Sequence, residues 1–262
     1  MLNYPRINPN IIEIGPVRIR WYGLMYVLGF LASYLLIPRQ NRAKEIGLEG
    51  KTLQDLIFYL ALGLVVGARL GYILFYQYAN LGYYLRQPVE IIATWHGGMS
   101  FHGGLIGSII AGYLFSRSRK MPFWAMADSV AVTAPIGLGL GRIGNFINGE
   151  LYGRVTNVPW AMVFPNSDGL SRHPSQLYEA FFEGLVLFVI LWKLRKKDYP
   201  DGHMVLYFML LYGIFRFFLE FFRQPDPQIG LLFGIFSMGQ ILCMAMIIFS
   251  AMFLLLKRSD QG

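Results

Sequence analysis

The sequence predicts an all-α integral membrane protein with seven transmembrane helices. Of its 262 residues, 55% are hydrophobic and only 15% are charged, whereas soluble domains carry roughly 25% charged residues. Apolar runs close to the ~20 residues that cross a bilayer recur along the whole chain. They cover about residues 21–38, 53–76, 97–115, 122–140, 175–192, 202–222 and 235–256. No segment between them is long enough for a separate core, so we expect one polytopic domain over residues 1–262.

The positive charges predict the orientation of the chain. Thirteen Lys and Arg residues lie in the loops after the first, third and fifth runs and at the C-terminus, against eight in the longer opposite segments. Cytoplasmic loops are enriched in Lys and Arg, so we expect the N-terminus outside and the C-terminus in the cytoplasm. Residues 141–174 then form a small head on the outer side. The formal net charge is +8, but no basic tail or patch is present, which argues against nucleic-acid binding.

Polar side chains from several runs are predicted at similar depth, near the outer surface. Charged groups inside a membrane are costly and mark functional interiors. Arg216 and Glu220 are four residues apart and share one helix face, whereas Asp128 lies in the inner half of its run. The other groups of this set are Tyr22, Arg69, His102, Arg142, Glu179 and Glu183. Their convergence predicts one outward-facing pocket, about level with the outer lipid headgroups.

The run GRIGNFINGELYGR, residues 141–154, is the richest polar stretch of the chain. It places two guanidinium groups, two amides and a carboxylate directly after a long apolar segment. These groups belong to Arg142, Asn145, Asn148, Glu150 and Arg154. Arg forms paired charge-assisted hydrogen bonds with phosphate, and glycines let a backbone approach a ligand closely. The run therefore predicts a site for a phosphate-bearing anion at the membrane boundary.

Structural alternatives exist for several of these residues. Arg142 and Arg154 could extend to lipid headgroups from a helix end; the glycines beside Arg142 favour a functional role, and Arg154 stays open. Arg216 could pair only with Glu220 in its own helix. Arg69 could contact a ligand or pair with a carboxylate of the fifth run, Glu179 or Glu183.

The two histidines near the predicted pocket differ in their context. His102 lies among glycines and is either a structural histidine or the imidazole best placed to move protons. His173 precedes Pro174 and Ser175, which resemble a helix start with Ser175 near the N-cap, so His173 is expected to be structural or close to the substrate.

Other features predict packing rather than chemistry. Small-residue stripes over residues 63–71 and 103–107 are expected to pack helices closely, and residues 80–92 form an amphipathic segment that could lie along the outer surface. The lone Cys243 excludes internal disulfides and is expected to pack. No His, Cys and Asp cluster has metal-ligand spacing and no phosphate loop is present, so we expect no metal and no cofactor.

Four further blocks accompany GRIGNFINGELYGR: WYGLMY from residue 21, GGMSFHGG from residue 97, RHPSQLYE from residue 172 and FRFFLEFFRQPD from residue 215. Together, and in this order over nearly the whole chain, the five blocks resemble the bacterial prolipoprotein diacylglyceryl transferase family. The seven-span topology of that family, with its N-terminus outside, agrees with the charge distribution.

The resemblance implies transfer of the diacylglyceryl group of phosphatidylglycerol to the thiol of the lipobox cysteine in a preprolipoprotein, with release of glycerol phosphate. It implies a place in the bacterial cytoplasmic (inner) membrane, with the site facing the periplasm. Partners would be phosphatidylglycerol, the preprolipoprotein signal peptide and membrane lipids. In the family, the residue matching Arg142 contacts the phospholipid. The positions held important there match Tyr22, His102, Arg142, Asn145, Gly153, Arg216 and Glu220.

The same residues suggest roles in such a transfer. Arg142 and Arg216 would stabilise the negative charge that develops on the departing phosphate. A free thiol is largely protonated at neutral pH, so a general base would help; His102 is the first candidate, and Glu220 or Glu150 the second. The groups expected to bind or orient substrate besides the two arginines are Tyr22, Asn145, Glu150 and Gly153. No cofactor is needed, because the phosphate is already a leaving group.

Two other classes of protein are considered. A transporter or flippase for an anionic lipid or solute could use the same basic pocket, but alternating access favours midplane sites and repeated halves, and no internal repeat is visible. A structural scaffold would not need Arg216 and His102 within apolar runs. Formation of a thioether on a lipobox peptide separates the transferase from both.

Overall fold

The computed structural model describes residues 2–5, 7–15, 17–165, 167–224, 231–232 and 235–259. These residues are mostly helical, and the chain falls into two compact units. Unit 1 comprises Met1–Leu36 and Asp128–Gly262, and unit 2 comprises Ile37–Ala127. One long helix, Phe123–Asn148, contributes residues to both units.

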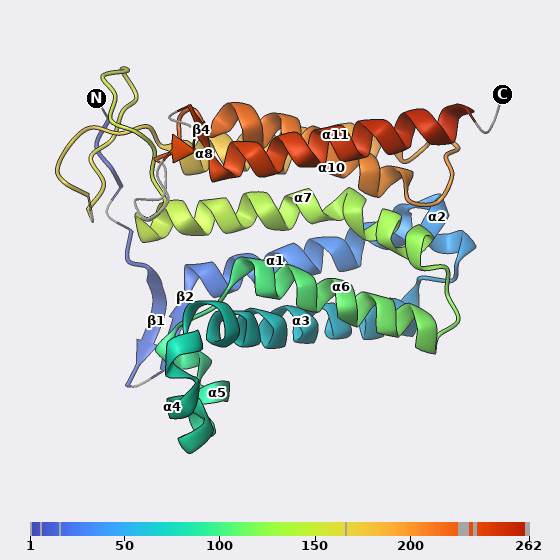
Figure 1. The fold of residues 1–262 in the computed structure, drawn as a ribbon, viewed down its shortest axis with the longest axis horizontal. Coiled ribbons are helices and arrows are strands. Elements are labelled where there is room, and N and C mark those ends of the chain that lie inside the picture. Colours follow the sequence, from blue (N-terminus) through green and yellow to red (C-terminus); the bar gives the residue numbers. More distant parts are fainter. Residues whose placement is uncertain are drawn as a thin grey trace. The chain divides into compact units, whose positions relative to one another are not determined.

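The α-helices described in unit 1 differ in length. They are α1 (Trp21–Leu36), most of α7 (Phe123–Asn148), α8 (Ser175–Glu179), α9 (Leu187–Leu194), α10 (His203–Leu219) and α11 (Met238–Ser259). A π-helical segment, Ala180–Val186, joins α8 to α9 in one continuous helical run. Helices α10 and α11 run side by side, in orange and red in Figure 1. Val132, Leu187, Leu191 and Met204 form a buried cluster that packs α7, α9 and α10 together.

Two short antiparallel strand pairs, which hydropathy did not predict, also belong to unit 1. Strand β1 (Asn10–Ile14) pairs with β2 (Val17–Arg20), and β3 (Leu231–Leu232) pairs with β4 (Phe236–Ser237). Gly15 turns the first pair with φ +57°, in the left-handed region that favours glycine. Because β2 leads directly into α1 and β4 directly into α11, each pair fixes the start of an apolar helix.

Unit 2 is built on α3 (Gly50–Gly71) and α6 (Phe101–Ser118), which pack along a stripe of glycines. A Cβ atom added to Gly107 of α6 would lie 2.1 Å from the carbonyl oxygen of Gly63 in α3. No side chain fits at that distance, so two backbones can approach this closely only at glycine. The predicted packing role of both stripes is therefore confirmed.

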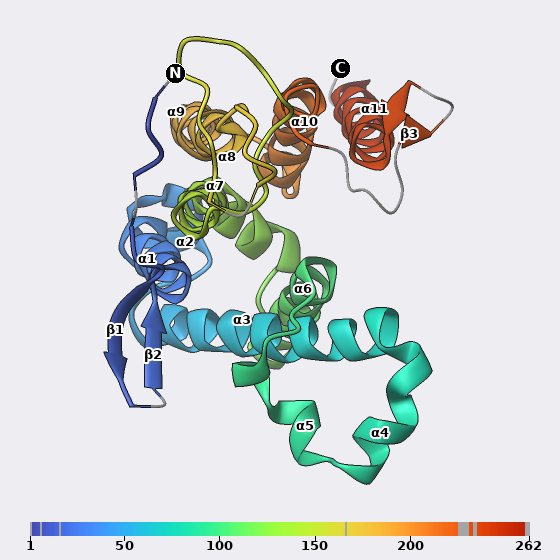
Figure 2. The same cartoon turned by 90° about the vertical axis from the view of Figure 1, so that its left-hand side faces the viewer.

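The connection between α3 and α6 forms a helical arm in unit 2. The π-helical segment Tyr72–Tyr76 continues α3, and the short helices α4 (Leu81–Arg86) and α5 (Val89–Ile92) follow. In Figure 2 these two helices extend away from the α3–α6 pair. Residues 80–92 are thus largely helical, and their place along the outer surface stays a prediction. The remaining short elements of unit 2 are α2 (Asn41–Glu45) and the 3-10 turns Ile37–Arg39, Tyr78–Asn80 and Thr94–His96.

Among the described residues, four helices are long and apolar enough to cross a membrane. They are Trp21–Arg39, Gly50–Tyr76, Phe123–Asn148 and Met238–Leu256; His203–Leu219 is a shorter apolar helix. All seven predicted apolar runs are helical over most of their length. Helix content and apolar helices together are those of an all-α integral membrane protein.

The predicted end of the fourth run near residue 140 is wrong, because α7 continues to Asn148. The helix ends where Gly149 adopts φ +66°, a left-handed conformation typical of helix C-termini. A single glycine inside a helix costs only about 1 kcal/mol, so Gly141 does not end α7. Arg142 and Asn145 therefore lie on the last turns of a helix and not in a loop.

Candidate functional site

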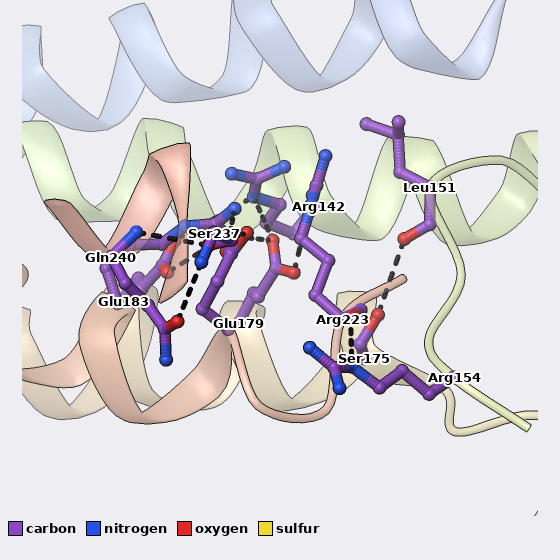
Figure 3. A network of polar contacts seen from close by, with 11 residues as sticks. Arg142, Leu151, Arg154, Ser175, Glu179, Glu183, Arg223, Ser237 and Gln240 are labelled. Atoms are coloured by element: carbon purple, nitrogen blue, oxygen red, sulfur yellow. Dashed lines mark hydrogen bonds and ion pairs between the residues drawn. The ribbon is translucent and has the colours of Figure 1, made fainter. Parts of the chain in front are cut away.

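Three arginines and three glutamates of unit 1 form one buried network (Figure 3). They come from α7, α8, the π-helical segment after it, α10 and the first residues beyond α10. The members are Arg142, Arg216, Arg223, Glu179, Glu183 and Glu220. Charges this deeply buried are tolerated only when they are paired, and here every charge has a partner of opposite sign.

Two arginines meet at a single carboxylate oxygen. The Oε2 atom of Glu179 lies 2.7 Å from Nε of Arg142 and 3.1 Å from Nη1 of Arg216. The two guanidinium groups come from α7 and α10, which are far apart in sequence. Because both contact one oxygen atom, they are close enough to contact one phosphate group. The sequence placed these three residues in one predicted set, but it did not predict that Glu179 lies between the two arginines.

Longer ion pairs complete the network. Glu183 lies 3.8 Å from Nε of Arg142 and 3.5 Å from Nη1 of Arg216, and Nη1 of Arg223 lies 3.6 Å from Glu179. The side chains of Glu179 and Glu183 are 1% exposed, against 20% for Arg142 and 12% for Arg216. The carboxylates therefore lie behind the guanidinium groups, which face the more accessible side.

Close helix packing places Glu183 within this network. A Cβ atom on Gly184 would lie 2.7 Å from the Cα atom of Gly139, so the π-helical segment and α7 touch through two glycines. Glu183 precedes one of these glycines, and Arg142 follows the other by less than one turn. The contact therefore carries the carboxylate towards the arginine.

Sequence reasoning missed Arg223 as a member of the site and counted it only as a loop cation. A signal was present, because Arg216, Glu220 and Arg223 are spaced i, i+4, i+7, the period of one helix face. The first turns after α10 remain helical enough to keep that face together, with the amide of Glu220 bonded to the carbonyl of Arg216. Both Glu179 and Glu183 had been recognised only by their depth.

Glu220, a second-choice base in the sequence analysis, has both carboxylate oxygens in use. Oε2 lies 2.8 Å from Nη2 of Arg216, and Oε1 accepts a hydrogen bond of 3.1 Å from the hydroxyl of Ser237. A carboxylate with both oxygens occupied by donors is better suited to orienting Arg216 than to accepting a proton.

The last turns of α7 carry a second, smaller polar group. The side-chain amides of Asn145 and Asn148 both donate to Oε1 of Glu150, at 2.9 and 3.0 Å. Tyr22 of α1 packs on the same helix, since a Cβ atom on Gly144 would lie 2.8 Å from its ring. Asn145, Glu150 and Tyr22, three of the predicted substrate-binding residues, are thus gathered around the C-terminal end of α7.

Gly153 allows the head segment to touch the end of α10. A Cβ atom there would lie 2.5 Å from the carbonyl oxygen of Phe222, and the amide of Arg154 donates to that same carbonyl at 2.9 Å. Nε of Arg154 donates to the carbonyl of Arg223 at 2.9 Å. Arg154 therefore ties the head to the segment that carries Arg223, and Gly153 makes this approach possible.

Two residues of the head form its internal framework. Arg172 is buried, pairs with Asp168 at 2.7 Å and donates to the carbonyl of Gly153 at 3.1 Å. The guanidinium group lowers the pKa of Asp168 mainly through this hydrogen bond. Helix α8 begins at Ser175 with Pro174 as its N-cap, so the predicted helix start is confirmed. The hydroxyl of Ser175 donates to the carbonyl of Leu151 at 3.3 Å.

His173 lies in an aromatic group beside the network. Its Nδ1 atom lies 3.2 Å from the hydroxyl of Tyr178, which also accepts a hydrogen bond of 2.6 Å from the indole of Trp160. Its ring packs edge-on against Phe222. Burial lowers the pKa of His173, which fits the structural role expected for it.

In unit 2, His102 is the second residue of α6 and its side chain is exposed. The preceding Ser100 is the N-cap of that helix and accepts a hydrogen bond of 3.2 Å from the amide of Gly103. Ser100 is thus committed to the helix start.

Arg69 is held by backbone carbonyls within unit 2. Its guanidinium group donates to four backbone carbonyls of unit 2, at distances between 2.5 and 3.0 Å. The acceptors are Glu90, Ile91, Gly97 and Gly98. Arg69 therefore holds the arm and the turn before α6 against α3, and it pairs with no carboxylate among the described residues.

Asp128, which the sequence placed in the inner half of its apolar run and away from the other polar residues, also has a structural role. Its carboxylate accepts hydrogen bonds from the amides of Gly202 and Val205, at 2.7 and 3.0 Å. These amides belong to the first turn of α10, where a negative charge is favoured. Asp128 therefore fixes the start of the helix that carries Arg216 at its other end.

Within the described ranges, no group of three or more His, Cys, Asp or Glu residues could hold a metal ion.

Comparison with known proteins shows the family of this chain. A family model described as prolipoprotein diacylglyceryl transferase matches residues 9–256. The phosphatidylglycerol–prolipoprotein diacylglyceryl transferase of Geobacter sulfurreducens is 51% identical over 262 residues, which is 100% of both chains. Relatives with the same name are 52% identical in Desulfotalea psychrophila, over 93% of this chain and 91% of theirs, and 51% identical in Pasteurella multocida, over 99% and 96%. The chain therefore belongs to the prolipoprotein diacylglyceryl transferase family.

Proposed function

We propose that this protein transfers the diacylglyceryl group of phosphatidylglycerol to the lipobox cysteine of preprolipoproteins, forming a thioether and releasing glycerol phosphate. Membership of the family and the names of the relatives support this reaction. The observation that carries the proposal is the meeting of Arg142 and Arg216 at one oxygen of Glu179, since it gives two guanidinium groups within reach of one phosphate.

The proposal includes a place and an orientation for the chain. It is one polytopic domain of the bacterial inner membrane with seven spans, its N-terminus in the periplasm and its C-terminus in the cytoplasm. The excess of Lys and Arg in the loops assigned to the cytoplasm supports this orientation. Residues 141–174 form the periplasmic head, of which 149–165 and 167–174 are non-helical.

The arginines would hold the phosphate with their outward-facing nitrogens. Among the described residues, Arg142 forms ion pairs only through Nε, so its Nη1 and Nη2 atoms can form a bidentate contact with phosphate oxygens. Arg216 and Arg223 would add positive charge beside it. As the carbon–oxygen bond to phosphate breaks, the charge on the departing group rises, and each well-placed donor stabilises that state by roughly 3–4 kcal/mol.

The transfer itself needs one proton to leave the thiol. The cysteine sulfur forms a bond to the glycerol carbon while the bond from that carbon to the phosphate oxygen breaks, and glycerol phosphate leaves with the bonding electrons. His102 is the proposed base that takes the thiol proton. Glu150 is the remaining second choice, because both oxygens of Glu220 are occupied. The residues proposed to orient the headgroup are Tyr22, Asn145 and Gly153.

The arginine proposal is tested by release of glycerol phosphate from phosphatidylglycerol, measured with the purified full-length protein in detergent and a lipobox peptide. Arg142→Ala and Arg216→Ala should each abolish release. Arg119→Ala is the matched control, because Arg119 is half exposed, pairs with Asp55 at 2.5 Å and lies over the Phe115 ring in unit 2, outside the network. Wild-type rates in both site variants would reject the phosphate clamp.

The base is tested with His102→Gln across a pH series. If His102 takes the thiol proton, the variant loses rate and the limb of the pH profile near the pKa of histidine disappears. A variant with normal rate and an unchanged profile would move the role to Glu150. The rival class, a transporter or flippase for an anionic lipid, makes no covalent bond, so a thioether on the lipobox peptide in mass spectra decides against it.

A further inference from the structure

The N-terminal turn of α11 touches the site network although none of its residues was predicted to matter. Ser237 and Gly239 both contact the carboxylate of Glu220, which in turn pairs with Arg216. We propose that Ser237 and Gly239 are positioning residues that hold Glu220 and thereby aim Arg216 at the phosphate of the lipid substrate. This inference rests on the proposed function of Arg216.

Ser237 is fixed by a reciprocal cap at the start of α11. Its amide donates to Oε1 of Gln240 at 3.0 Å, and the amide of Gln240 donates back to the hydroxyl oxygen of Ser237 at 3.2 Å. This is a capping box. Since the hydroxyl oxygen accepts from the helix, its proton is left to donate, and it does so to Oε1 of Glu220 at 3.1 Å. Figure 3 shows Ser237 and Gln240 beside the acidic residues of the network.

Gly239 supplies the space that Glu220 occupies. A Cβ atom at Gly239 would lie 2.9 Å from Oε1, 3.0 Å from Cδ and 3.3 Å from Oε2 of Glu220. The whole carboxylate group therefore rests on the first turn of α11, where the glycine has no side chain. That turn also presents the positive end of the helix dipole to the carboxylate. Even a single methyl group at residue 239 must displace the carboxylate.

The position of the Glu220 carboxylate determines where the guanidinium group of Arg216 lies. Its Oε2 atom lies 2.8 Å from Nη2 of Arg216, while Nη1 of the same arginine lies 3.1 Å from Glu179. The two carboxylates contact different nitrogens, so together they fix the plane of the guanidinium group. Loss of either contact leaves that plane free to rotate. The first turn of α11 thus controls the contact between Glu220 and Arg216, although it does not touch Arg216 in the contacts described here.

The experiment measures the steady-state constants of Gly239→Ala and Ser237→Ala, in the full-length protein, with both substrates varied. Gly137→Ala is the matched glycine control, because an added Cβ there meets nothing within 4 Å. Ser250→Ala is the matched serine control, because the buried Ser250 hydroxyl donates to the carbonyls of Met246 and Ile247 in its own helix, α11. Thermal unfolding in detergent is recorded for all four variants.

Both site variants should lose about 10-fold or more in kcat/KM for phosphatidylglycerol, the usual size for loss of one charge-assisted hydrogen bond. The KM for the lipobox peptide should stay within about 2-fold, and both controls should match wild type. If Gly239→Ala does not fold, Ser237→Ala decides alone. Wild-type constants for the site variants, or losses no larger than those of the controls, overturn the inference. A wild-type protein that releases no glycerol phosphate would instead reject the proposed function.

Discussion

Glu179 is the residue on which the geometry of the network depends, so Glu179→Gln tests the whole arrangement. The carboxylate contacts three guanidinium groups, at 2.7, 3.1 and 3.6 Å. Removing one partner of a buried ion pair costs about 3–5 kcal/mol. Glutamine keeps one carbonyl oxygen as an acceptor, so we expect a loss near the lower end, about 3 kcal/mol. That free energy corresponds to a decrease in kcat/KM on the order of 100-fold if it falls on the transition state.

The assay compares Glu179→Gln with Glu183→Gln, its matched control. Glu183 is equally buried, but its contacts with Arg142 and Arg216 are longer, 3.8 and 3.5 Å. Release of glycerol phosphate and thermal unfolding are measured for both variants. Glu179→Gln should cost more in both measurements, because it breaks the shorter contacts. Equal losses, or a larger loss for Glu183→Gln, would refute the reasoning that Glu179 joins the two arginines.

Three further predictions concern the framework around the site. Arg69→Gln removes most of four hydrogen bonds to carbonyls, so limited proteolysis of the arm should become at least about 10-fold faster. Gly107→Ala should lower the unfolding temperature, since its Cβ atom would lie 2.1 Å from a carbonyl oxygen, whereas Gly82→Ala, with open space around it, should not. Burial lowers the pKa of His173 below 6.5; the unfolded chain therefore binds the proton more readily, and stability falls as pH drops below 6.5. His173→Phe should reduce the difference in unfolding temperature between pH 7 and pH 5.

Much of the fold could be predicted because hydropathy and glycine spacing act locally. Seven apolar runs became helices, and the stripe containing Gly63 and Gly107 became the contact between α3 and α6. Helix ends were harder, since a helix stops where backbone conformation changes and not where polarity rises. Polar residues at 142, 145 and 148 continue α7 until Gly149 adopts a left-handed conformation.

The sequence predicted which residues gather near the site better than it predicted which of them form ion pairs. Their positions along the apolar runs predicted that Arg142, Arg216 and the glutamates lie at one depth, because charged groups in a membrane must avoid contact with lipid. Depth says nothing about which carboxylate each arginine contacts. Arg69 illustrates the gap: it lies at a similar predicted depth, yet its partners are carbonyls of its own unit. Such partners leave no signal in side-chain composition, since every residue carries a carbonyl.

The pairing of acids and bases also explains how an anion site can persist inside an apolar environment. Three guanidinium groups alone would carry an uncompensated charge that the membrane disfavours; three carboxylates make the network formally neutral. Glu179 and Glu183 are buried more deeply than Arg142 and Arg216. In the proposed function, an incoming phosphate would therefore meet the arginines before the carboxylates that pair with them. Reversing this order of burial would leave the same net charge but would remove the proposed phosphate contact.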